Sequence, residues 1–177
     1  FEKLGFEKDE KLYQSIIGQL RLNWKGERIE LNFPKSEISP CDTPLELTRA
    51  LGKEPVELWR GADYLAVYED ESDILSITPD FTLLGQLDSR GVIVTAPGRD
   101  SDFVSRFFAP QCGINEDPVT GSAHCDLMPY WVNRLNRNRL SAAQLSKRGG
   151  RLQCELAGDR VLIAGKAVQY LAGTIVI

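Results

Sequence analysis

The sequence is poor in the side chains that build metal and disulfide sites. It has one histidine and four cysteines among 177 residues, and no two cysteines have the Cys-x-x-Cys spacing of a zinc site. A chain of this length with so few cysteines does not depend on a disulfide scaffold. We therefore expect no metal site and four free thiols, as in a reducing cytoplasm: Cys41, Cys112, Cys125 and Cys154.

The sequence also lacks a long basic run and a long apolar run. Its 21 Lys and Arg residues against 25 Asp and Glu give a net charge of −4, whereas nucleic acids and anionic membranes require a basic face. No apolar run approaches the roughly 20 residues that cross a bilayer, and no secretory signal is visible. These absences predict a cytoplasmic protein with neither nucleic acid nor membrane as its partner.

Alternating and continuous apolar patterns predict many strands. Apolar and polar residues alternate over 19–24 and 28–33, which indicates a hairpin that Pro34 ends. Residues 91–96 are almost entirely apolar and predict a strand buried on both faces. Further strands are expected at 64–68, 74–77, 103–108, 152–156, 161–164 and 168–177.

One long helix is expected to begin near Ser122. Ala123, Leu127, Trp131 and Leu135 recur at a spacing of four residues and form a broad apolar stripe. Shorter helices are predicted over 43–52, for one turn after Asp80, and from Ser141, where Ser-Ala-Ala-Gln has the form of a capping box. The order of elements favours an α+β fold, in which a curled, mostly antiparallel sheet wraps around a central helix.

The segment 110–124 stands apart in composition. It is rich in acidic, hydroxyl and glycine residues just before the long helix, whose first N–H groups can receive a carboxylate. Gly121 permits close approach of a ligand, and Thr120 and Ser122 can each donate or accept a hydrogen bond. Asp117 would lie at the rim, where it could orient an amine. The same residues are also common helix caps, and Glu116 is interpreted as solvated.

Several motifs resemble the signature of the PhzF-like family of phenazine biosynthesis. The most specific is Glu-Asp-Pro-Val-Thr-Gly-Ser-Ala-His over 116–124, and the resemblance continues through Arg-Phe-Phe-Ala-Pro over 106–110, Pro-Tyr-Trp over 129–131 and Gln-Leu-Ser-Lys-Arg-Gly-Gly over 144–150. It covers most of residues 15–177, in order and with consistent spacing.

This resemblance implies a fold, a reaction and a site. The fold is the diaminopimelate-epimerase-like one, with two similar domains and the active site between them. The reaction is a cofactor-independent isomerisation or epimerisation of a small carboxylate by general acid–base proton transfer, in an enzyme that forms a homodimer. Asp117 and Ser122 match the catalytic residues of the second domain, and Thr120, Gly121 and Ser122 would bind the substrate.

The family's N-terminal half, which carries a proton-shuttling glutamate, has no counterpart among these residues. We therefore expect 15–177 to be the C-terminal PhzF-like domain, 1–14 to be a tail or a remnant of the N-terminal domain, and the chain alone to be inactive. His124, inside the helix, is interpreted as structural.

Two other functions remain open at this point. A non-catalytic ligand- or protein-binding member of the family would keep the pocket without the reaction. A cysteine-dependent racemase would use Cys112 or Cys125, although a buried apolar role suits Cys125 better.

Overall fold

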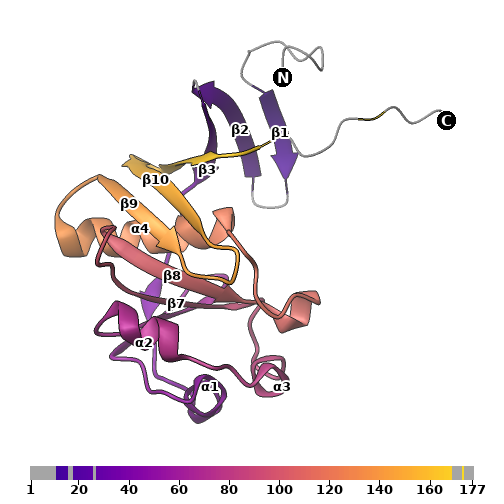
Figure 1. Ribbon diagram of the computed structural model, residues 1–177, viewed down its shortest axis with the longest axis vertical. Coiled ribbons are helices and arrows are strands. Elements are labelled where there is room, and N and C mark those ends of the chain that lie inside the picture. Colours follow the sequence, from indigo (N-terminus) through magenta and orange to yellow (C-terminus); the bar gives the residue numbers. More distant parts are fainter. Residues whose placement is uncertain (1–10, 16–17, 26, 169–172, 174–177) are drawn as a thin grey trace.

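The computed structural model describes residues 11–15, 18–25, 27–168 and 173. Within these ranges, eleven strands form one open sheet in the order β1-β2-β3-β11-β10-β9-β8-β7-β6-β5-β4 (Figure 1). The strands are β1 (Lys11–Ser15), β2 (Gly18–Lys25), β3 (Arg28–Pro34), β4 (Ser39–Pro40), β5 (Glu57–Arg60), β6 (Tyr64–Val67), β7 (Val92–Pro97), β8 (Phe103–Phe108), β9 (Arg139–Gln144), β10 (Gly150–Ala157) and β11 (Arg160–Lys166).

Helices cross between the strands that run parallel. The β6–β7 and β8–β9 pairs are parallel, and the other pairs are antiparallel. A parallel pair needs a crossover on one face of the sheet. The helices are α1 (Leu45–Leu51), α2 (Glu71–Ser76), α3 (Phe81–Leu84) and α4 (Gly121–Leu135), with a short 3-10 turn at Pro110–Cys112.

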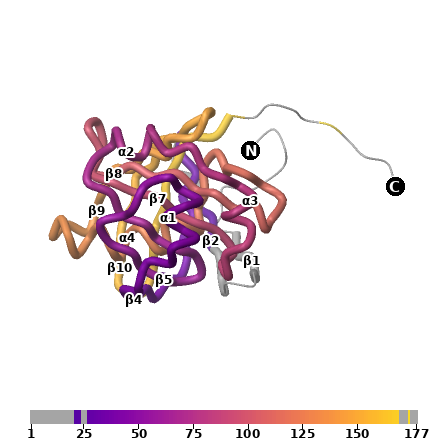
Figure 2. Tube along the Cα trace, turned by 90° about the horizontal axis from the view of Figure 1, so that it is seen from below, coloured from indigo at the N-terminus to yellow at the C-terminus, as the bar shows by residue number. Residues whose placement is uncertain are grey.

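The two faces of the sheet are covered by different helices. Alternate residues of one strand point to opposite faces, so Ile93 of β7 packs with α4 while Val92 and Val94 pack with the short helices. In Figure 1, α1, α2 and α3 lie below β7, whereas α4 lies behind β8 and β9. Figure 2 looks from below onto the three short helices. The expected α+β fold, with a mostly antiparallel sheet around a long helix, is confirmed.

The middle of α4 anchors the larger core. Trp131 is 1% exposed and stacks on Phe103 with 5.6 Å between ring centroids and 4° between the planes. Its Nε1 donates to Thr95 Oγ1 at 3.0 Å, so the indole N–H is satisfied in an apolar environment. The periodic apolar stripe of the sequence is the face that α4 presents to the sheet, and the helix runs on through Pro129.

The predictions for the hairpin over 19–33, for β7, β8 and β10, and for the turn after Asp80 are confirmed. The expected strand over 74–77 is wrong, because Ile74 lies in α2. Asp70 caps this helix by accepting from the N–H groups of Ser72 and Asp73. Ile74 is then buried, whereas Leu75 is 56% exposed.

The helix expected from Ser141 is also wrong, because these residues form β9. The N–H and the hydroxyl of Ser141 both donate to Asp102 Oδ2, at 2.6 and 2.8 Å, in a strand that pairs with β8 and β10. Tertiary pairing therefore outweighs the local capping pattern. Of the strand expected over 168–177, Val168 lies beyond β11 and is 91% exposed, and all the rest except Gly173 falls outside the described residues. At the start of the chain, Lys11–Ser15 form β1, which pairs with β2.

Candidate functional site

The loop that carries the predicted site residues lies at one end of the sheet strands. Tyr64 pairs with Val92 and Val92 with Phe108, so β6 and β7 begin where β8 ends. The chain then turns back toward α4, and the backbone N–H of Asp117 donates to the carbonyl of Phe107 at 3.0 Å. This end of the sheet brings together the starts of two strands, the site loop and the first turn of α4.

Asp117 and Thr120 are tied to each other and to Gln144 at the end of β9. The Thr120 hydroxyl donates to Asp117 Oδ2 at 2.5 Å, and its backbone N–H donates to Gln144 Oε1 at 2.8 Å. Gln144 Nε2 donates to the carbonyl of Asp117 at 2.8 Å and to Thr120 Oγ1 at 3.1 Å. Gln144 is 1% exposed, so a fully used buried amide fixes the shape of the loop. The Thr120 hydroxyl donates its proton to Asp117. The Thr120 side chain makes no capping hydrogen bond to the N–H groups of α4.

Ser122, in the first turn of α4, is linked to an ion pair whose carboxylate is buried. Arg90 Nη2 donates to Ser122 Oγ at 3.2 Å. The same guanidinium forms a two-pronged pair with Asp63, with Nε donating to Oδ1 at 2.9 Å and Nη2 donating to Oδ2. The Asp63 side chain is 0% exposed, whereas that of Arg90 is 40% exposed. The positively charged Arg90, whose partner Asp63 is buried, therefore lies beside Ser122.

Gly91 allows this arrangement to be compact. A Cβ at residue 91 would lie 2.5 Å from the ring of Phe107, which no real Cβ tolerates. At Gly121 the demand is milder, because a Cβ there would lie 3.4 Å from ring carbons of Phe33. That distance is close to an ordinary van der Waals contact, so the side of Gly121 that a Cβ would occupy faces Phe33 of β3 without a strict need for glycine.

The next residues of α4 point into the protein. His124 is 0% exposed, its Nδ1 lies 2.8 Å from the Thr120 carbonyl, and burial lowers its pKa to about 4. Cys125 is also buried, and burial raises the pKa of its thiol to about 12. A neutral buried imidazole supports the structural interpretation of His124. A thiol that resists ionisation is poorly suited to the nucleophile or base of a racemase.

Glu116 is not solvated, contrary to the expectation. Its side chain is only 20% exposed and pairs with Arg106 of β8, through bonds of 2.7 and 3.1 Å to the two carboxylate oxygens. Arg106 Nη1 also donates to the carbonyls of Ile74 and Ile77. This ion pair ties the site loop to the end of α2.

Sequence reasoning located Asp117, Thr120, Gly121 and Ser122 on one loop and helix start. All but Thr120 are partly exposed there. It missed Arg90 and Asp63, which lie 27 residues apart and carry no local motif. The signal that could have found them is that each precedes a strand of the same parallel pair.

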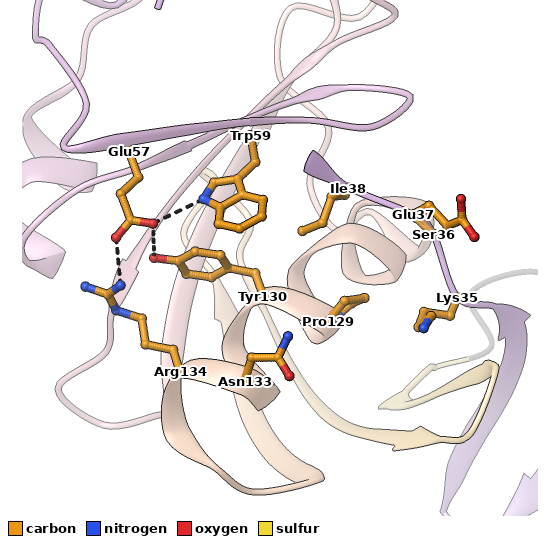
Figure 3. Close-up of a pocket in the computed structure, with 10 residues that line it drawn as sticks. All are labelled: Lys35, Ser36, Glu37, Ile38, Glu57, Trp59, Pro129, Tyr130, Asn133 and Arg134. Carbon is orange, nitrogen blue, oxygen red and sulfur yellow. Dashed lines mark hydrogen bonds and ion pairs between the residues drawn. The ribbon is translucent and has the colours of Figure 1, made fainter. Parts of the chain in front are cut away.

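One described pocket borders the site loop, and another groove lies elsewhere on α4. The groove in Figure 3, of about 620 Å³, runs along the later turns of α4 beside Trp59 and Tyr130. Glu57 accepts hydrogen bonds from both aromatic side chains and from Arg134 there. A second pocket lies between 146–148 and the residues on either side of Asp117, which are Glu116 and Pro118. A third borders 148–152 and 165–168. No group of three or more His, Cys, Asp or Glu side chains in the described part of the chain could hold a metal ion.

Comparison with known proteins identifies the class to which this fold and loop belong. A family model described as phenazine biosynthesis-like protein, PhzC-PhzF, matches residues 29–173. The solved structure of a PhzF family phenazine biosynthesis protein from Enterococcus faecalis is similar with a TM-score of 0.84 and 45% identity, covering 90% of this chain and 62% of that chain. A putative PhzC/PhzF protein from Clostridium difficile gives a TM-score of 0.86 at 36% identity, over 95% of this chain and 65% of that one.

The chain belongs to the PhzC-PhzF family of phenazine biosynthesis-like proteins. Two proteins of Pseudomonas aeruginosa, each named an uncharacterized isomerase, are 48% and 51% identical to it over 158 and 162 residues. These matches cover 89% and 91% of this chain but only 61% and 62% of the relatives. The chain thus spans about three fifths of the length of the curated relatives it matches.

Proposed function

We propose that this chain supplies the C-terminal half-site of an isomerase or epimerase that needs no cofactor and acts on a small carboxylate by general acid–base proton transfer. The observation that carries the proposal is the joining of Asp117, Thr120 and Gln144 in one hydrogen-bonded unit at the start of α4. Relatives named as isomerases support the class of reaction.

Ser122 and the first N–H groups of α4 would hold the substrate carboxylate, because a helix start offers unpaired donors and a positive dipole end. The Thr120 side chain leaves those N–H groups uncapped. Asp117 would receive a substrate amine or hydroxyl on Oδ1, since its Oδ2 is the oxygen that accepts from Thr120. Gly121 would line the same pocket.

The proton itself would be moved by a glutamate on an N-terminal half. The matched relatives are longer than this chain by a margin of domain size, which is consistent with such a half. On this proposal residues 15–177 are the C-terminal domain, 1–14 are the remnant or tail, of which 11–14 extend the sheet of the domain as part of β1, and the 177 residues alone are inactive.

Solvent exchange tests the proposal. The chain would be joined to the N-terminal part of the 51% identical Pseudomonas relative and incubated in deuterated water with a dihydro-hydroxyanthranilate, the substrate that the resemblance to the phenazine enzyme implies. Deuterium entering carbon positions would be followed by NMR. Asp117→Asn should slow the exchange by roughly 100-fold or more, the scale of a lost proton-transfer or orienting group.

The matched control is Asp159→Asn, at the exposed turn between β10 and β11, which should exchange at the wild-type rate. Equal exchange in the Asp117→Asn variant would contradict the role of Asp117. Ligand binding without any exchange would favour the non-catalytic binding member of the family, and loss of exchange on thiol alkylation would favour a cysteine-dependent racemase.

We also propose that the protein works in the cytoplasm and forms a homodimer. All four cysteines are free thiols, which supports a reducing compartment. None of the helices in the described ranges is long and apolar enough to span a membrane. Light scattering on the purified protein tests the dimer.

A further inference from the structure

Arg90 is held rigidly at the start of α4 by three neighbours. Asp63 takes Nε and Nη2, the face of Phe107 lies 5.7 Å below the guanidinium carbon, and Ser122 accepts from Nη2. A long side chain ordinarily loses rotamer freedom when it binds a ligand. In Arg90 this rotamer freedom is already lost when the protein folds, so ligand binding loses little more.

The guanidinium still has a free edge. Its bonds to Asp63 and Ser122 use Nε and Nη2, and no hydrogen bond to Nη1 occurs within the described part of the chain. The Arg90 side chain is 40% exposed although its partner Asp63 is completely buried. The buried Asp63 carboxylate therefore binds the Nε and Nη2 edge of the guanidinium, and the Nη1 edge, which we call the outer edge, faces solvent.

Arg90 also decides what Ser122 can do. Because Arg90 donates to Ser122 Oγ, the hydroxyl oxygen already acts as an acceptor and its own proton remains available. Ser122 is thereby turned into a donor for an anionic ligand. The outer edge of Arg90 and the Ser122 hydroxyl then present donors on adjacent groups.

We propose that Arg90 is a specificity-determining residue that binds the acidic group of the substrate through its free Nη1 edge, together with Ser122. The inference rests on the proposed function in one respect, because both locate a carboxylate at the start of α4. It goes further in naming a residue from outside the loop motif and in requiring a planar acid as the substrate.

The recognition depends on geometry more than on net charge. Asp63 already balances the charge of Arg90, and Asp126 lies close enough to act on it electrostatically, so a simple anion gains little attraction. A carboxylate instead gains a directed hydrogen bond from Nη1 and one from the Ser122 hydroxyl. The position of Nη1 depends on the two-pronged pair with Asp63, which a lysine ammonium cannot form. Arg90→Lys should therefore lose most of the binding.

Binding of two small probes to the 177-residue chain tests this. Anthranilate carries a carboxylate, and aniline is the same ring without it. NMR shift titrations should give binding of anthranilate to residues around Ser122. Arg90→Gln should weaken that binding by roughly 10-fold or more, the value of a charged hydrogen bond, and should leave the weak binding of aniline unchanged.

Two controls separate recognition from folding. Arg134→Gln, at an exposed arginine paired with Glu57, should bind anthranilate like the wild type. Arg90→Gln leaves Asp63 buried without its partner, so Asp63→Asn combined with Arg90→Gln removes both charges and should fold while still failing to bind.

Equal anthranilate affinity in the wild type and in the double variant would overturn the inference, as would the absence of anthranilate binding in the wild type. The proposed function fails separately. If binding depends on Arg90 but the completed protein exchanges no deuterium, the inference holds and the isomerase proposal does not.

Discussion

Two buried ionisable residues on α4 respond to pH in opposite directions. His124 Nδ1 must carry the proton, because a carbonyl oxygen can only accept, and Nε2 finds no partner among the described residues. Its pKa, lowered to about 4, means that stability falls as pH drops from about 6.5 toward 4. Asp126 is 2% exposed, its Oδ2 has no hydrogen-bond partner among the residues that the structure describes, and burial raises its pKa to about 6.

For Asp126 the folded state binds the proton more tightly than the unfolded chain, whose aspartates titrate near 4. Its contribution is therefore fully present below about pH 4 and is lost as pH rises to about 6. Relative to Asp126→Asn, the wild-type free energy of unfolding should fall by on the order of 2 to 3 kcal/mol over this range, at about 1.4 kcal/mol per pKa unit. Urea unfolding of both proteins at pH 4, 5, 6 and 7 measures this difference. The pH dependence that comes from His124 drops out of the difference because both proteins contain His124. A difference that is constant with pH would contradict the raised pKa.

At the scale of elements, the segments that could be predicted from the sequence are those whose apolar pattern reflects which side chains are buried. The apolar run of β7 and the stripe of α4 are such cases. The predictions were wrong where a four-residue segment fits both a helix and a strand pattern, as at Ile74 in α2 and Ser141 in β9. The choice between the two is made by strand pairing with residues distant in the sequence. The same reason applies to the site. Asp117 and Ser122 lie within one motif, but Arg90 reaches Ser122 across 32 residues only after β6 and β7 pair in parallel.

The pair between Glu116 and Arg106 connects β8, α2 and the site loop, and its value can be measured. Glu116→Gln should lower the free energy of unfolding by about 1 to 3 kcal/mol, since it removes charge-assisted bonds from side chains that are only 13% and 20% exposed. The matched control is Glu155→Gln, whose partner Arg139 is 81% exposed, and it should cost less than about 1 kcal/mol. Urea midpoints compare the two. Equal losses would show that the pair at Glu116 is worth no more than a surface ion pair.

At the scale of the molecule, a single sheet separates two apolar clusters within the described part of the chain. One contains the inner face of α4, including Leu127, and the other contains the short helices, including Ile74. Both clusters draw on alternate residues of the same strands, as Ile93 and Val94 of β7 illustrate. Neither cluster can lose its sheet face without exposing the other, so the described part of the chain should unfold as one cooperative unit.

This cooperativity predicts that damage to either cluster moves the same transition. Leu127→Ala and Ile74→Ala each truncate a side chain that is 0% exposed, and each should lower the free energy of unfolding by roughly 2 to 5 kcal/mol. The dependence on urea concentration should stay unchanged, because the same surface is exposed on unfolding. Leu75→Ala, next to Ile74 but 56% exposed, serves as the control and should cost little. Urea unfolding followed by Trp fluorescence includes the α4 side, because two of the three tryptophans, Trp59 and Trp131, pack in that cluster. Far-ultraviolet circular dichroism reports on the whole. Two separate transitions in the Ile74→Ala variant would mean that the short helices can detach while the sheet and α4 remain folded.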